Sequence, residues 1–290
     1  MKRTIYVQIP AYRDSELPRT IHDLYRKADR PEKIRTVVVW QHGKGESLPR
    51  ATTSLSNVQI IPFPASSSKG PNWARALLQD NYQGEEFTLF LDSHHRFVRG
   101  WDEQLVVMYR RLKKRGVRKP IITAYLPSYD PHREPYGRMR ELLKIYPLKR
   151  EHGMLTRLTG RPLALWKWLK EPIPAHFISL HFLFAEGHFN HEIRFDPEIY
   201  FFGDEVLVSL RAFSEGYDMF HPHVIMGWHL YDRATRVPHW DDHQKWSDSN
   251  RASYSKMRKI FSGRYDNGYL GNVRSVRDYE SYIGTRLIQN

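Results

Sequence analysis

An aspartate and a histidine two positions apart, Asp92 and His94, are the residues best suited to chemistry. They follow the apolar run from Phe87 to Leu91, which predicts a buried strand that delivers both side chains to its exposed end. One carboxylate oxygen and one imidazole nitrogen suit Mn²⁺, Zn²⁺ or Fe²⁺ better than a cation that prefers only oxygen. The competing interpretation is that Asp92 caps a turn and that His94 is merely polar.

A metal ion held by two side chains needs further ligands. His229 follows a second extended apolar segment, residues 219–228, and is the candidate for a third protein ligand. The remaining positions would be filled by the oxygens of a diphosphate. The chain has 15 histidines, so a chance arrangement is easy to find, and each histidine taken singly also fits a structural role.

Two helix starts carry further candidates. Residues 70–75 (GPNWAR) place a loop before a helix, where backbone N–H groups attract anions and Arg75 could clamp a phosphate. Asp204 and Glu205 begin another helix, where acidic side chains complement the helix dipole. The functional alternative is that one of these carboxylates faces a reacting sugar or an acceptor hydroxyl.

Alternating strand and helix patterns surround these candidates and predict an α/β layered fold. Strands are expected at 5–9, 36–40, 58–61, 87–91 and 182–184, and helices near 17–28, 72–81, 101–115 and 204–214. Ligands of such sheets collect beyond the carboxyl ends of the strands, where 10–14, 41–42 and 92–95 lie. The segment 127–174 is expected to be rich in loops, and 241–290 to form an appendage packed on the main domain.

The composition restricts the classes of function without choosing one. The net charge of +13 fits nucleic acid, an anionic membrane surface or phosphorylated substrates, and solvated helix faces explain much of it. No stretch approaches the roughly 20 apolar residues that cross a bilayer. Cysteine is absent, which excludes disulfides and favours the cytoplasm, with peripheral contact at the inner membrane face as a further option.

An ordered set of segments resembles the GlcNAc-transferase family whose type member modifies hydroxyproline on Skp1 (glycosyltransferase family 60). The resemblance covers nearly the whole chain, and the ordered set is more specific than any one motif. The segments are 9–14 (IPAYRD), 70–76 (GPNWARA), 91–97 (LDSHHRF), 100–102 (GWD), 181–187, 200–205 (YFFGDE), 228–229 (WH), 273–275 and 278–280.

The resemblance implies a GT-A glycosyltransferase fold, with a mixed and mostly parallel Rossmann-like sheet, and a retaining mechanism. It also implies a UDP-sugar donor, UDP-GlcNAc above all, and Mn²⁺ or Mg²⁺ as cofactor. Residues 1–240 would form the catalytic domain, with a nucleotide-sugar half of about 1–120 and an acceptor half of about 121–240. The family is similar to the more distant polypeptide GalNAc-transferases, which also use Asp-x-His and a later histidine.

By the same resemblance, each candidate residue acquires a role. Asp92, His94 and His229 would hold the metal ion, and Asp204 or Glu205 would face sugar and acceptor. The residues expected to contact the donor are Pro10, Ala11, Arg13, Gln41, Asn72, Arg75, Ser93 and Tyr231.

The acceptor is left open by the resemblance. The basic stretch from Arg110 to Arg161 fits an anionic surface glycan, such as capsule or lipooligosaccharide, at least as well as a protein hydroxyl. Two other classes compete with the transferase: a basic nucleic-acid binder and a histidine-rich metallohydrolase. We expect no nucleic-acid partner, because so many ordered segments agree with the transferase.

Overall fold

The computed structural model describes residues 4–265 and 268–289 and contains one large mixed sheet. The pairs β3–β2, β2–β1, β1–β4 and β6–β11 are parallel, whereas β10 runs antiparallel to both of its neighbours. In spatial order the strands are β3 (Val58–Pro64), β2 (Ile34–His42), β1 (Ile5–Tyr12), β4 (Phe87–Leu91), β10 (Phe182–Glu186), β6 (Pro120–Thr123), β11 (Asp218–His221) and β9 (Ile173–Pro174).

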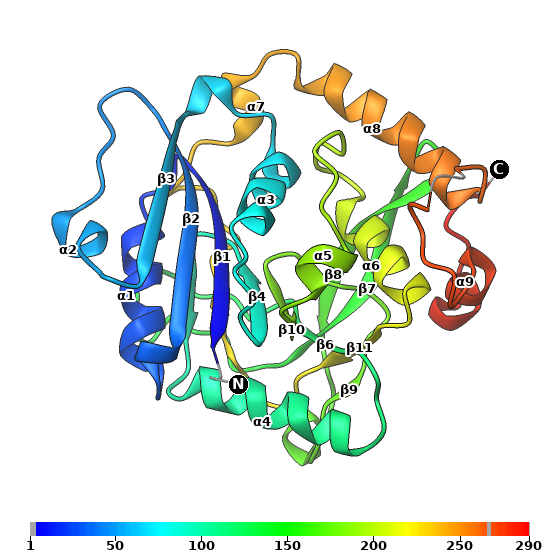
Figure 1. Cartoon of the computed structure of the whole chain (residues 1–290), viewed down its shortest axis with the longest axis horizontal. Helices are drawn as coiled ribbons and strands as arrows, with labels where there is room; N and C mark the ends of the chain where they lie inside the picture. Colours follow the sequence, from blue (N-terminus) through cyan, green and yellow to red (C-terminus); the bar gives the residue numbers. More distant parts are fainter. Residues whose placement is uncertain (1–3, 266–267, 290) are drawn as a thin grey trace.

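Helices cover both faces of this sheet, as the alternating pattern predicted (Figure 1). On one face Val7 and Ile9 pack with residues of α1 (Leu17–Lys27) and α4 (Trp101–Lys114). On the other face Tyr6 packs against α3 (Pro71–Asp80), and its hydroxyl donates to the Leu78 carbonyl over 2.6 Å. The predicted strands and helices of the first half are therefore confirmed, and β1 extends three residues beyond the predicted end.

The expectation of a loop-rich segment at 127–174 is wrong in part. Two long antiparallel strands, β7 (Leu143–Glu151) and β8 (Met154–Pro162), form a hairpin there. Few of their residues are buried; Ile145, Met154 and Leu155 are the apolar ones. Because charged and apolar residues share both faces, the hairpin lacks the alternation that identifies a strand in sequence.

A second, two-stranded sheet joins distant parts of the chain. β5 (His95–Phe97) pairs antiparallel with β12 (Gly227–His229), which sets His229 opposite His95. A Cβ atom at Gly227 would lie 2.4 Å from the carbonyl oxygen of Arg96. Only glycine permits this close approach of the two backbones.

The C-terminal helices pack on the second half of the chain. Residues of α8 (Trp246–Phe261) and α9 (Val276–Ile283) belong to the same apolar core as α6 (Asp204–Ser214), with Met257 and Tyr279 fully buried. In Figure 1 they lie beside α6, on the side away from β1–β3. A chain division near residue 240 stays a prediction.

The remaining elements are short, and within the described residues no helix is long and apolar enough to span a bilayer. They are α2 (Arg50–Thr53), α5 (Phe189–Glu192), α7 (His239–Asp242) and the 3₁₀ turns η1 (Pro31–Lys33), η2 (Ala65–Ser67) and η3 (Trp166–Trp168).

Replacing Met257 by alanine should lower the free energy of unfolding by about 2–5 kcal/mol, because it leaves a cavity between α8 and the start of α6. Met257 is fully buried and its sulfur lies close to Gly203. The exposed Lys259 on the same helix is the matched control, and Lys259→Ala should change stability by about 0.5 kcal/mol or less. Urea unfolding of both variants measures their free energies of unfolding. Equal free energies for the two variants would contradict the packing of α8.

Candidate active site

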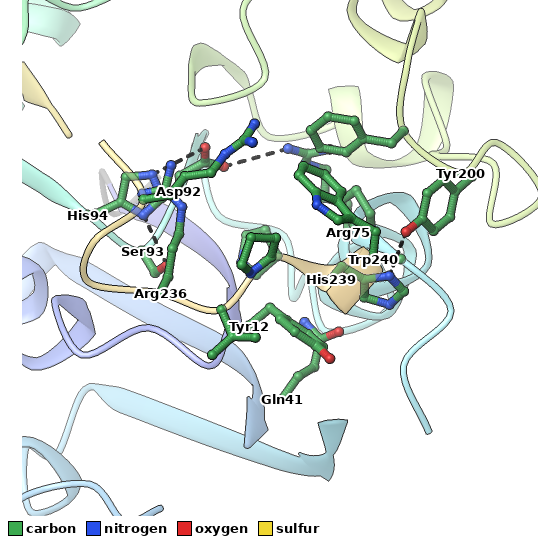
Figure 2. Close-up of a pocket in the computed structure, with 17 residues that line it drawn as sticks. Tyr12, Gln41, Arg75, Asp92, Ser93, His94, Tyr200, Arg236, His239 and Trp240 are labelled. Atoms are coloured by element: carbon green, nitrogen blue, oxygen red, sulfur yellow. Dashed lines mark hydrogen bonds and ion pairs between the residues drawn. The ribbon is translucent and has the colours of Figure 1, made fainter. Parts of the chain in front are cut away.

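Two adjoining cavities open beyond the carboxyl ends of β1, β2 and β4. The smaller has a volume of about 180 Å³ and the larger about 610 Å³. Asp92, which follows β4, lines both cavities, and so does Arg75 from α3. Figure 2 shows the smaller cavity, with Asp92 and Arg75 side by side in its wall. These two residues therefore mark the junction.

Asp92, His94 and His229 come together at this junction, with one potential ligand atom of each within 4.8 Å of the others. The Asp92 Oδ2 atom lies 3.4 Å from His229 Nε2 and 3.9 Å from His94 Nε2. A divalent ion with ligands at about 2.0–2.2 Å brings its donor atoms to a similar mutual separation, roughly 3–3.5 Å. The three residues predicted from the sequence thus have the spacing of a metal site.

The two imidazoles present nitrogens that no neighbour uses. His94 Nε2 and His229 Nε2 are buried and lack a hydrogen-bond partner among the described residues. Buried polar atoms are normally paired, so an orphaned pair beside a carboxylate needs an explanation. A bound cation supplies one, and the donor set of two nitrogens and one oxygen fits a divalent ion such as Mn²⁺, Zn²⁺ or Fe²⁺.

Asp14 orients His94 for this role. Its carboxylate lies 2.6 Å from His94 Nδ1 and also accepts a 2.6 Å hydrogen bond from the Ser93 hydroxyl. Burial opposes the charge of Asp14 and acts to raise its pKa. The hydrogen bond and the charge interaction with His94, together with further hydrogen bonds, outweigh burial and lower the pKa of Asp14. An ionised carboxylate only accepts, so Nδ1 carries a hydrogen and Nε2 is the nitrogen that remains available to a cation.

Two further histidines surround the triad without joining it. His181 stacks on His229 with ring centroids 4.1 Å apart, but its nitrogens contact the Ser179 hydroxyl and the Leu126 N–H. His95 lies opposite His229, and burial lowers its pKa to about 3. Both rings form the neutral wall behind the triad.

Arg75 connects the triad to the acidic start of α6. Its guanidinium lies 3.6 Å from Asp92 and 3.2 Å from Asp204. Burial acts to raise the pKa of Asp92, but the charges of His94 and Arg75 outweigh burial and lower it. Asp92 is therefore held as a carboxylate at the junction.

Both predicted carboxylates of α6 line the larger cavity and are engaged by neighbours. Asp204 accepts from the backbone N–H of Glu205 over 2.8 Å as well as pairing with Arg75. Glu205 accepts from the Tyr125 hydroxyl and, over 3.0 Å, from the backbone N–H of Leu180.

Only some of the residues predicted to contact the donor line one of the two cavities. The smaller cavity is lined by Pro10, Gln41, Arg75 and Ser93, and the larger one by Tyr231 together with Arg75. Ala11, Arg13 and Asn72 line neither. Arg13 points to another depression and pairs with Glu46 and Asp242, and Asn72 bonds the Ile199 carbonyl. Direct donor contact by these three stays a prediction without geometric support.

Sequence reasoning missed a polar chain in the smaller cavity. The Tyr200 hydroxyl lies 2.7 Å from His239 Nδ1, and His239 Nε2 lies 3.0 Å from the Ser68 hydroxyl. The Ser68 hydroxyl in turn donates to the amide oxygen of Gln41 over 2.5 Å. Figure 2 shows Tyr12 and Trp240 in the same cavity wall. His239 and Trp240 belong to α7, far along the chain from β1 and β2, and no local pattern marks them.

Comparison with known proteins identifies the family. A family model described as Glycosyltransferase (GlcNAc) matches residues 4–57 and 51–267. No curated protein matches the chain. Among solved structures, GalNAc-T7 with UDP, GalNAc and Mn²⁺ is similar at a TM-score of 0.59 and 14% identity, and the match covers 98% of this chain and 55% of that one.

A second similar structure is S. aureus TarS 1–349, with a TM-score of 0.54, 13% identity, and coverage of 92% of this chain and 74% of that one. TarS in complex with UDP matches at a TM-score of 0.51. At such low identity the likeness concerns the fold, which is GT-A, whereas the family match extends along most of the sequence. The chain therefore belongs to the GlcNAc glycosyltransferase family and has a GT-A fold.

Proposed function

We propose that this glycosyltransferase is retaining and metal-dependent and moves GlcNAc from UDP-GlcNAc to a hydroxyl group. The acceptor would be a surface glycan or a protein hydroxyl, and the enzyme would be related to the Skp1-hydroxyproline GlcNAc-transferases. One observation carries the proposal: Asp92 and two buried, unpartnered imidazole nitrogens meet where two cavities join. The similar structures support it, because GalNAc-T7 is in complex with UDP, GalNAc and Mn²⁺ and TarS with UDP.

The smaller cavity is the proposed seat of the UDP moiety. Tyr12 and Trp240 offer ring faces for the uracil, and Gln41 offers an amide beside them. Arg75 and Arg236 line the same cavity nearer to Asp92 and add positive charge where the diphosphate would lie. The sugar would then extend past Asp92 into the larger cavity.

Asp92, His94 and His229 would hold the cation. A bound Mn²⁺ or Mg²⁺ offsets the negative charge that builds on the departing diphosphate. Arg75, which is nearly buried between Asp92 and Asp204, adds a fixed positive charge to the same place.

Asp204 and Glu205 orient groups in this scheme and do not act as a strong base. Burial and the neighbouring Asp204 raise the pKa of Glu205 to about 7, which makes it more basic than an exposed carboxylate. Both of its oxygens, however, already accept hydrogen bonds from Tyr125 and Leu180, so neither is directed at an acceptor. The acceptor hydroxyl would attack the anomeric carbon from the face that UDP leaves. Its proton passes to the leaving phosphate, so the C1–O bond to UDP breaks as the new glycosidic bond forms.

Replacing Asp92 by alanine should reduce Mn²⁺-dependent release of UDP from UDP-GlcNAc by roughly 100-fold or more, since the triad loses its only carboxylate. UDP and Mn²⁺ together should raise the melting temperature of the wild type and not of the variant. Glu32→Ala, at an exposed acidic position, is the control and should behave as wild type. Full UDP release by Asp92→Ala would refute the metal assignment.

Asp14→Asn should raise the Mn²⁺ concentration needed for half-maximal UDP release by about 10- to 100-fold, because the amide no longer fixes the tautomer of His94. Saturating Mn²⁺ should restore most of the rate. A titration of UDP release against Mn²⁺ measures both quantities. An unchanged half-maximal concentration would show that Asp14 only packs against His94.

The Glu205→Gln substitution should flatten the dependence of stability on pH. Because the folded-state pKa of Glu205, about 7, is above its ordinary value of 4.5, its protonated form stabilises the fold below pH 4.5. That contribution is lost as the pH rises to about 7, at a cost of about 1–3 kcal/mol. The free energy of unfolding, measured from pH 4.5 to 8, should show this fall in the wild type relative to Glu205→Gln. If the free energies of both proteins changed with pH in parallel, the pKa of Glu205 would lie near its ordinary value.

A further inference from the structure

The loop after β8 exposes two large apolar side chains. Leu165 and Trp168 each keep 76% of their surface accessible, although burying either would normally stabilise a fold. Leu165 precedes the 3₁₀ turn η3 and Trp168 ends it, and the Trp168 N–H donates to the Leu165 carbonyl over 2.9 Å. This hydrogen bond holds the two exposed residues in one tight turn.

Leu165 is also held in an unfavourable backbone conformation. Its φ of 57° lies in the left-handed region, where glycine or asparagine is the ordinary choice. An exposed leucine at such a position gains nothing from folding and costs backbone strain. Strain at an exposed apolar residue is typical of a surface that binds something.

Positive charge surrounds this apolar pair. Lys167 and Lys170 lie within the loop, and the Arg111 guanidinium of α4 donates to the Lys170 carbonyl over 3.2 Å. Val107, Arg111 and Lys114 share one face of α4, at i, i+4 and i+7, and Val107 is 61% exposed. In Figure 1 α4 and β9, which follows the loop, lie at the same edge of the molecule.

Only part of this charge is neutralised. Glu171 pairs with Arg111 and with Arg115, so one carboxylate serves two guanidinium groups. Among the described residues no ion pair involves Lys114, Lys167 or Lys170, all of which are exposed. The surface therefore keeps a positive field around an apolar centre.

We name this surface the Leu165/Trp168 face; it consists of Leu165, Trp168, Lys167, Lys170 and the Val107–Arg115 end of α4. We propose that the Leu165/Trp168 face docks on an anionic lipid bilayer. Tryptophan is favoured at the interface between headgroups and acyl chains, and a leucine beside it inserts into the acyl region. Lysines at the rim reach anionic headgroups by extending their side chains. A nucleic acid would engage the cations and the indole ring but would leave Leu165 in water.

The face is connected to the larger cavity through the hairpin. Pro162, the last residue of β8 and three residues before Leu165, lines that cavity, as does Leu143, the first residue of β7. Docking would therefore bring the acceptor side of the site close to the membrane. The docking inference itself does not depend on the proposed reaction.

Sedimentation with vesicles tests it directly. The whole chain should co-sediment with vesicles of one part phosphatidylglycerol to two parts phosphatidylcholine, and far less with phosphatidylcholine alone or at high salt. Leu165→Asn combined with Trp168→Ser should weaken the partition about tenfold or more. Asparagine tolerates the left-handed backbone, so the melting temperature should stay the same or rise.

The control is Tyr136→Ser, which removes an aromatic side chain that is 88% exposed elsewhere on the surface and should leave vesicle binding unchanged. Failure of the wild type to sediment with anionic vesicles overturns the proposal. So does equal sedimentation of the Leu165/Trp168 variant and the wild type. Oligonucleotide binding that depends on Leu165 and Trp168 while vesicle binding does not would assign the face to nucleic acid instead.

Discussion

The pairing of β5 with β12 is the constraint on which the site depends. It brings His229 beside Asp92 and His94, which lie far from it in the sequence, and the Leu230 N–H adds a 3.1 Å bond to the His94 carbonyl. A side chain at residue 227 would push the strands apart, because its Cβ would meet the Arg96 carbonyl. Backbone bonds, and not the side chains of the triad, thus set the separation of the potential ligands, so that the site is preorganised before any ion binds.

A single buried arginine pairs with both carboxylates at the junction. Arg75 stands between Asp92 and Asp204, so each carboxylate has a partner although neither is fully in solvent. Buried charges are tolerated when they are paired and hydrogen-bonded, and an unpaired one is costly. This arrangement keeps Asp92 ionised, whereas burial raises the pKa of both acidic residues of α6, that of Glu205 to about 7. Pairing with Arg75 therefore outweighs burial only with the help of further charges, which Asp92 has in the neighbouring histidines.

Local patterns predicted the first half of the fold well, because β1, β2 and β4 are buried on both faces and read as apolar runs. Asp92 and His94 were found from the same patterns, since both follow β4 directly. Asp14 was placed only in the segment 10–14 after the first strand, as its contact with His94 spans 80 residues and leaves no local signal. His181, His239 and Trp240 were missed for the same reason. The β7–β8 hairpin was missed because its charged residues mask the alternation of a strand.

The two cavities differ in the elements that form them. The ends of β1, β2 and β4 and helix α3 form one side of the smaller cavity, and residues within 200–201 and 233–240 form the other. The side at the strand ends depends on backbone geometry shared by many α/β proteins. The larger cavity is closed by the β7–β8 hairpin, whose exposed, charged strands contribute little to the core. Residues on such an element can change without unfolding the protein, whereas those at the ends of the central strands cannot change freely. If the smaller cavity holds the donor, as proposed, differences in acceptor among relatives should accumulate in the hairpin, while the strand ends and the triad stay constant.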